Sequence, residues 1–223
     1  MAENEIRKRT LRRGGARNRA GRQSAQLKAK NCRDLIAAAG IAWAAETPFN
    51  RFATFAFGKS GIDALDCVAA TGDFIKLARE WFASHGLPMP WAWVQEWGPI
   101  NLAHCHILLH VPPALAPLFR AKPRQWVAKI IAKRGGVYVR GSTDCHKIPN
   151  SENPDHYPDA YRAALTFKVH YMLKCAPAEL EQKLGMTGSG PKPWGQSCPV
   201  YGKRLAAWQG WEKCCDEGRD WLN

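Results

Sequence analysis

Residues 95–110 have the sequence Gln-Glu-Trp-Gly-Pro-Ile-Asn-Leu-Ala-His-Cys-His-Ile-Leu-Leu-His. They join two segments rich in aromatic and aliphatic residues, 91–97 and 103–111, across a Gly98-Pro99 break. Both segments have strand character, and two strands this close in sequence favour antiparallel pairing. The stretch therefore predicts a pair of antiparallel strands, and with it an α+β fold.

The second of these strands carries a pair of histidines on one face. Because successive side chains of a strand alternate, His104, His106 and His110 point to one side and the intervening apolar residues to the other. The apolar side suits packing against a helix. Two imidazoles separated by one residue can converge on one metal ion, although two exposed strand histidines can also coincide by chance.

The preceding strand can bring a carboxylate to the same place. Glu96 lies eight residues before His104, and Gln95 competes for the third position because the sequence does not determine the strand register. A His-His-Glu set leaves coordination positions open for a phosphate oxygen. Mixed nitrogen and oxygen ligands suit Mg²⁺ or Mn²⁺, and imidazole favours Mn²⁺.

Patterns outward from this hairpin predict the other elements. Helical periodicity and end signals predict helices over 34–47, 73–85, 123–134 and 160–175. Period-two alternation predicts strands over 51–57 and 137–140. Segment 142–159 is polar and turn-rich, and 185–203 is expected to be a long loop. This order predicts an antiparallel sheet flanked by helices.

Composition narrows the class of protein. The chain has 223 residues, 46% of them hydrophobic, which is enough for one domain with a sizeable core. No run approaches the ~18 apolar residues of a membrane span, so no membrane partner is expected. No secretory signal peptide is visible, and the eight cysteines show no CxxC pair. We therefore expect reduced thiols and a cytoplasmic protein.

Positive charge is concentrated at the N-terminus. The net charge of the chain is +13, and residues 1–33 hold 11 Lys and Arg against two Glu. This basic arm (residues 1–33) is expected to be flexible and to bind a phosphate backbone, with a solubilising tail as the alternative. The candidate DNA-binding residues are Arg7, Lys8, Arg9, Arg12, Arg13, Arg17, Arg19 and Arg22.

A tyrosine and a lysine share one face of the predicted helix 160–175. Tyr171 and Lys174 are three residues apart, and this spacing makes side chains neighbours on a helix. A tyrosine hydroxyl can attack a phosphodiester if a metal-bound phosphate and positive charge activate it. Lys174 is the candidate source of that charge. Without these partners, Tyr171 would be an ordinary half-buried helix aromatic.

Three motifs in order resemble the HUH endonuclease superfamily, and within it the single-tyrosine rolling-circle replication initiators. They are the Phe- and Thr-containing strand 52–57, the strand His104-Cys105-His106 and the helix Tyr171-Met172-Leu173-Lys174. Segment 200–205, Val-Tyr-Gly-Lys-Arg-Leu, is also similar to a Gly-Lys-Arg segment of some bacterial initiators. Cys105 departs mildly from the family, which usually has a larger aliphatic residue there.

The resemblance implies a ferredoxin-like or RRM-like central antiparallel sheet. It implies an HUH domain over 34–180, between the basic arm and a Trp-rich extension, 181–223, packed on that domain. His104, His106 and Glu96 would hold the metal, and Tyr171 and Lys174 would be catalytic. The implied activity is metal-dependent, site-specific nicking and rejoining of single-stranded DNA through a 5′-phosphotyrosine, which initiates rolling-circle replication of a plasmid, phage or similar element.

Other functions remain open at the level of sequence. A single-tyrosine HUH transposase uses the same chemistry, whereas a relaxase is disfavoured because Tyr171 follows the histidines. A non-catalytic RRM-like nucleic-acid-binding protein is the alternative from another class. Residues 185–190 have the glycine spacing of a P-loop, but Pro191 stands where Lys is required. An initiator of this kind would work at a replication origin with a separate host helicase and DNA polymerase.

Deleting residues 1–30 should flatten the salt dependence of DNA binding, because fewer cations would then displace counterions from phosphates. Cleavage of a saturating oligonucleotide should change little. Binding titrations over a range of salt concentrations measure the slope. An unchanged slope would refute the role of the basic arm.

Overall fold

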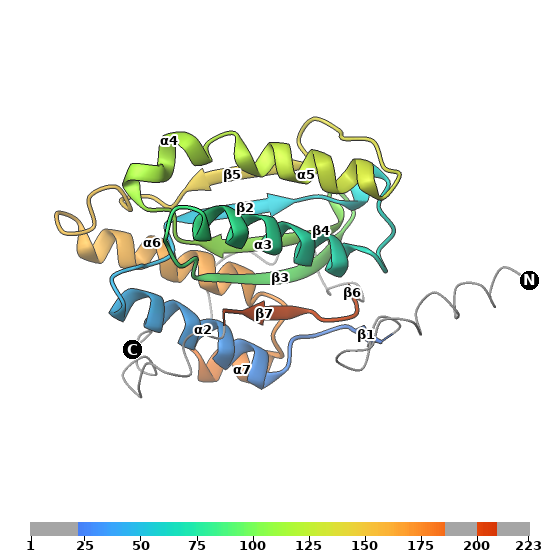
Figure 1. The fold of residues 1–223 in the computed structure, drawn as a ribbon. Helices are drawn as coiled ribbons and strands as arrows, with labels where there is room; N and C mark the ends of the chain where they lie inside the picture. The colour runs from blue at the N-terminus through green and yellow to red at the C-terminus, as the bar shows by residue number, and fades with distance from the viewer. Residues whose placement is uncertain (1–21, 186–199, 209–223) are drawn as a thin grey trace, which may run out of the picture.

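The protein is built on a five-stranded antiparallel sheet (Figure 1). The computed structural model describes residues 22–185 and 200–208. The strand order in the sheet is β5-β2-β4-β3-β7, and every neighbouring pair is antiparallel. The strands are β2 (Arg51–Phe55), β3 (Trp91–Gly98), β4 (Leu102–Leu109), β5 (Thr143–Lys147) and β7 (Leu205–Ala207).

Helices cover both faces of this sheet, and the expected α+β class is confirmed. On one face, α3 (Cys67–Ala83) and α5 (Lys122–Lys133) enclose a core with the odd-numbered residues of β4, from Cys105 to Leu109. On the other face, α2 (Ala29–Ala44) and α6 (Pro158–Met172) enclose a second core that contains Leu108. The alternation predicted for the histidine strand is therefore confirmed.

Shorter elements complete the described part of the chain. They are β1 (Gln23–Ser24), which pairs with β6 (Val200–Tyr201), two 3₁₀ turns η1 (Gly58–Ser60) and η2 (Pro113–Leu115), and the helices α4 (Ala116–Phe119) and α7 (Ala178–Lys183). Among the described residues, no helix combines the length and the apolar character needed to cross a bilayer. The five described cysteines are free thiols.

The N-terminal helix begins earlier than its sequence indicates. It was expected from residue 34, but α2 starts at Ala29 because Leu27, Cys32 and Leu35 are buried in the second core. The backbone N–H of Leu27 donates to the carbonyl of Cys175 (3.0 Å). Residues 22–33 are therefore not a flexible arm, and a deletion that preserves the fold must end at residue 21.

The strand that the sequence predicts over residues 137–140 lies in a later segment of the chain. Residues 137–140, expected to be a strand, form an irregular segment in which Val137 and Val139 are exposed. Strand β5 lies instead within the polar stretch 142–159, where Phe52 of β2 pairs with His146. Pairing with β2 outweighs the local β-propensity of the valines, because strand stability depends mainly on cross-strand contacts.

The C-terminal extension contributes to the sheet itself. Strand β7 pairs with β3, with Val94 opposite Leu205, and the backbone N–H of Trp208 donates to the carbonyl of Trp91 (2.8 Å). The extension is thus an integral edge strand here rather than only a packed segment. Trp211 and Trp221 lie outside the described residues.

Gly58 marks a close approach between η1 and β4. A Cβ atom at this position would lie 2.6 Å from the Cβ of Leu102 and 2.7 Å from the backbone nitrogen of Ala103. Gly58→Ala should lower the free energy of unfolding by about 1–3 kcal/mol, because the backbone of β4 would have to move. Urea denaturation measures the change.

Gly72 provides the matched control, because it lies within α3 and a Cβ there meets no atom within 4 Å. Gly72→Ala should raise the free energy of unfolding by about 0.5–1 kcal/mol through the gain in helix propensity. Equal effects of the two substitutions would contradict the close approach at Gly58.

Candidate metal centre

Strands β3 and β4 bring Glu96, His104 and His106 together on the sheet face that α2 and α6 cover. Glu96 pairs directly with His104 across the strands. Its Oε2 atom lies 3.4 Å from Nε2 of His104 and 3.3 Å from Nε2 of His106. One ligand atom from each residue lies within 4.8 Å of the other two. The expected ligand set is therefore assembled in one place.

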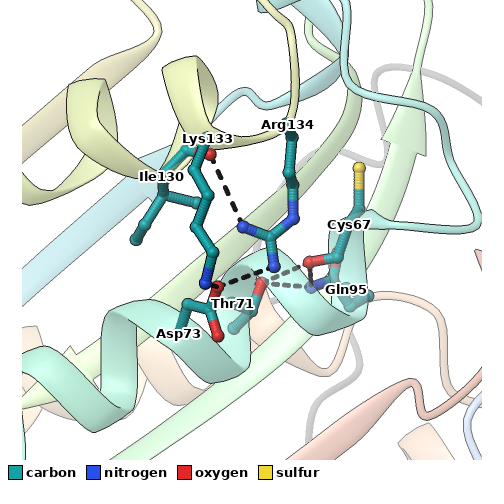
Figure 2. Close-up of polar contacts among 7 residues, drawn as sticks. All are labelled: Cys67, Thr71, Asp73, Gln95, Ile130, Lys133 and Arg134. Carbon is teal, nitrogen blue, oxygen red and sulfur yellow. Dashed lines mark hydrogen bonds and ion pairs between the residues drawn. The ribbon is translucent and has the colours of Figure 1, made fainter.

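The register also resolves which residue is the third member of the set. Gln95 pairs with Cys105 and points to the opposite face, toward α3. Figure 2 shows its side-chain amide against α3, where it donates to the carbonyl of Cys67 (3.2 Å) and to the hydroxyl of Thr71. Gln95 is thus part of the packing behind the sheet, and Glu96 faces the histidines.

The same view shows how the helices behind the site are held together (Figure 2). Arg134, at the end of α5, donates to Oδ2 of Asp73 in α3 at 2.8 Å, and Lys133 approaches the same oxygen at 3.6 Å. Because Gln95 is hydrogen-bonded to α3, strand β3, which also carries Glu96, packs against a helix that is itself joined to the end of α5.

Hydrogen bonds orient both imidazoles. Nδ1 of His104 donates to the carbonyl of Leu102 (2.8 Å), which can only accept. Leu102 has a φ of 52°, a left-handed conformation that is uncommon for leucine. Nδ1 of His106 is hydrogen-bonded to the hydroxyl of Thr54 (2.9 Å). The carbonyl acceptor places a proton on Nδ1 of His104, whereas the Thr54 hydroxyl can donate to or accept from Nδ1 of His106. These bonds hold both Nε2 atoms toward Glu96, as metal-ligating histidines require.

Burial and neighbouring charges set the protonation states. Burial lowers the pKa of His106 to about 4, so the imidazole is neutral at neutral pH. Burial by itself would raise the pKa of Glu96, but His106, His104 and Lys174 outweigh it and hold that pKa well below its usual value. A neutral imidazole and an ionised carboxylate are the forms that bind a metal ion.

The residues fit a divalent cation. Oε1 of Glu96 and Nε2 of His106 are buried and have no hydrogen-bond partner. A buried polar atom without a partner costs roughly 1–3 kcal/mol, and a cation among the three ligands would satisfy both atoms. One carboxylate and two imidazoles offer mixed oxygen and nitrogen ligands to a divalent metal ion. The group can therefore hold a metal ion and leave coordination positions for a ligand.

The end of α6 delivers Tyr171 and Lys174 to this group. The rings of Tyr171 and His106 meet edge to face with centroids 5.1 Å apart, and Tyr171 remains 37% exposed. Lys174 forms an ion pair with Oε2 of Glu96, and its Nζ lies 3.8 Å from the centroid of the Tyr171 ring. The tyrosine is thus half-open to solvent directly beside the candidate ligands.

Two supporting residues were not singled out from the sequence. Thr54 lies opposite His106 in β2, and the ring of Phe52 stacks on His106 at 5.2 Å and 19°. Both belong to the Phe- and Thr-containing strand that the resemblance identified only as a motif. Their alternation at positions 52 and 54 is the signal that could have found them, since it places both on one face.

Several other predicted residues lie elsewhere. Residues Arg7 to Arg19 of the basic arm lie outside the described residues, and Arg22 is exposed beside β1. His110 lies just past β4, where its Nδ1 donates to the carbonyl of Pro48 (2.7 Å). In the described ranges, the candidate metal-binding group contains Glu96, His104 and His106 and not His110.

Comparisons with protein-family models, with curated proteins and with solved structures find no match to this chain.

Thr54→Val should weaken Mn²⁺ binding by about 10–100-fold, because the valine keeps the shape of the side chain but cannot hold Nδ1 of His106. Titration followed by calorimetry or by Mn²⁺ paramagnetic resonance measures the affinity. Thr143→Val on β5 is the matched control, because the buried hydroxyl of Thr143 has no hydrogen-bond partner. Equal Mn²⁺ affinities of the two variants would contradict the role of Thr54.

Proposed function

We propose that this protein is a metal-dependent DNA strand transferase that nicks and rejoins single-stranded DNA through a 5′-phosphotyrosine link. One observation carries the proposal: Tyr171 contacts His106 while Lys174 is paired with Glu96. A nucleophile, a cation and a candidate metal-binding group therefore meet at one place.

The charge at the site suits a phosphodiester. Glu96 is a buried carboxylate, and its negative charge is neutralised by the positive charge of Lys174 when no metal ion is bound. A divalent cation would make the site net positive, and positive charge held where a phosphoryl group reacts is the main contribution to catalysis of phosphoryl transfer. The net charge of +13 on the whole chain points to the same class of partner.

In the proposed reaction, the hydroxyl oxygen of Tyr171 attacks the phosphorus atom, and its proton passes through water to the leaving 3′ oxygen. The bond from phosphorus to the 3′ oxygen breaks, and that oxygen takes up a proton to become a free 3′-hydroxyl. The 5′ side of the strand remains linked to Tyr171. Attack of a 3′-hydroxyl on this link reverses the sequence, rejoins the DNA and restores the tyrosine.

Each residue has a distinct part in this reaction. Glu96, His104 and His106 would hold Mg²⁺ or Mn²⁺, which supplies Lewis-acid polarisation of a phosphate oxygen when bound. Lys174 lies against the Tyr171 ring and stabilises the negative charge that develops at the phosphate. Thr54 and Phe52 keep the His106 ring in place.

The fold supports the same proposal. The order β2-α3-β3-β4-α5-β5 matches the βαββαβ ferredoxin-like motif, which is the fold expected of an HUH endonuclease. An RRM-like binding protein shares this motif but stacks bases on an open sheet face. Here α2 and α6 cover the second face, which disfavours RRM-like binding.

The proposed biological role is the initiation of rolling-circle replication of a plasmid, phage or similar element in the cytoplasm. The free 3′-hydroxyl would serve as a primer for a DNA polymerase, and a separate host helicase would unwind the duplex. A single-tyrosine transposase would perform the same chemistry, and the DNA flanking the gene distinguishes the two. A replication origin favours the initiator, whereas subterminal hairpins favour the transposase.

Tyr171→Phe should abolish a covalent protein–DNA adduct, because phenylalanine has no hydroxyl to attack phosphorus. The assay incubates the protein with labelled single-stranded DNA from the regions flanking the gene, with Mn²⁺ or with EDTA, and separates the products on a denaturing gel. The wild-type adduct should require metal. If the flanking DNA gives none, a randomised single-strand pool replaces it.

Tyr157→Phe is the matched control, because Tyr157 is also exposed (48%) and lies at the start of the same helix. It should form the adduct as the wild type does. Persistence of the adduct in Tyr171→Phe, its formation in EDTA, or no adduct with the randomised pool would each overturn the proposal.

A further inference from the structure

The outer flank of α6 presents aromatic and cationic side chains in alternation. We define the α6 ridge as Phe167, Lys168, Tyr171 and Lys174. Phe167 is 48% exposed and Tyr171 is 37% exposed, and both lysines are half-buried. The buried side of the same helix is formed by Leu165, Val169 and Met172. The ridge therefore lies beside this buried side and continues past the end of α6 to Lys174.

Lys168 is held in an unusual environment for a surface lysine. Its Nζ lies 4.7 Å from the centroid of the Phe52 ring and 5.8 Å from that of Phe167. Burial lowers the pKa of Lys168, and the charge of Asp144 opposes this effect. Within the described residues, no carboxylate forms an ion pair with Lys168, and Asp144 is instead paired with His146 (3.5 Å). The ammonium group therefore lies near two aromatic rings and, in the described part of the chain, has no carboxylate within ion-pair distance.

Phe52 connects this ammonium group to the candidate metal centre. Its ring stacks on His106 at 5.2 Å and meets the edge of the Tyr171 ring at 5.9 Å. Lys168 thus lies beside Tyr171 across Phe52, on the side of β2 and β5. Lys174 also lies beside Tyr171 and forms an ion pair with the Glu96 carboxylate. Two cationic side chains therefore flank the proposed nucleophile along one ridge.

A flexible single strand matches this arrangement. Proteins that bind single-stranded nucleic acid combine positive charge along the backbone with aromatic rings on which unpaired bases stack. Phe167 and Tyr171 are four residues apart and share one face of the helix, so Phe167 offers an exposed ring next to the nucleophile. A duplex has no unpaired base to stack on that ring.

We propose that the α6 ridge binds the strand beside the cleaved bond, with Lys168 on the neighbouring phosphate and Phe167 stacked on an adjacent base. This inference rests on the proposed function for the identity of the cleaved phosphate. Binding of single-stranded DNA by the ridge does not require the cleavage reaction. The proposed path of the strand runs from the metal centre past Lys168 to Phe167.

The test measures binding of a labelled single-stranded oligonucleotide by fluorescence anisotropy in EDTA, over a range of salt concentrations. Lys168→Met keeps the aliphatic stem over Phe52 but removes the charge. It should weaken binding and reduce the slope of log K against log salt concentration by about 0.7, the contribution of one phosphate contact in single-stranded DNA. Lys168→Arg should restore the slope.

Phe167→Ala should raise the Kd by roughly 5–150-fold, as expected for the loss of one stacked base, and should leave the salt slope unchanged. Lys129→Met is the matched control for charge, because Lys129 is exposed on α5, on the other side of the sheet. Leu118→Ala on α4 is the control for exposed apolar surface. Thermal unfolding of every variant checks that the fold is retained.

A salt slope for Lys168→Met equal to that of the wild type and of Lys129→Met would overturn the phosphate contact. A Kd for Phe167→Ala equal to that of Leu118→Ala would overturn the stacking contact. These measurements need neither metal nor cleavage. Failure of the adduct assay together with a reduced slope would therefore reject the endonuclease while leaving the binding ridge in place, and the reverse result would reject the ridge alone.

Discussion

The antiparallel pairing of β3 with β4 is the constraint on which the rest of the structure depends. In this register Glu96 faces His104, and Gln95 points to the other side of the sheet. A slip of one residue would exchange the two, because neighbouring side chains of a strand lie on opposite faces. Two contacts oppose such a slip: the amide of Gln95 is bonded into α3, and its backbone N–H donates to the carbonyl of Arg204. The strand is therefore held in place from its far face and from its edge.

Burial of Glu96 then links the sheet to α6. A buried carboxylate is tolerated only when it is paired, and Lys174 and the two imidazoles are the groups that surround it. Because Lys174 follows the last turn of α6, this ion pair joins the end of the helix that carries Tyr171 to the sheet.

The two faces of the sheet differ in composition. Beneath α3 and α5, the face contains Phe55, Phe74 and other apolar side chains and has the character of an ordinary core. Against α6, the face combines apolar packing with the ligand group. Phe52 belongs both to this apolar packing and to the site, because its ring contacts His106, Tyr171 and the ammonium group of Lys168. A candidate ligand, the proposed nucleophile and a cation therefore all contact the Phe52 ring.

The sequence by itself determined the elements whose signals are local. Alternation along β4 separated the histidines from the apolar residues. The spacing of Tyr171 and Lys174 predicted that the two are neighbours on one helix face, although α6 ends at Met172 and Lys174 follows it. Tertiary structure alone decided that Glu96 rather than Gln95 faces the histidines, that β5 is Thr143–Lys147, and that α2 begins at Ala29. Periodicity reports which residues share a face, whereas strand register, partner choice and helix starts depend on contacts between residues far apart in the chain.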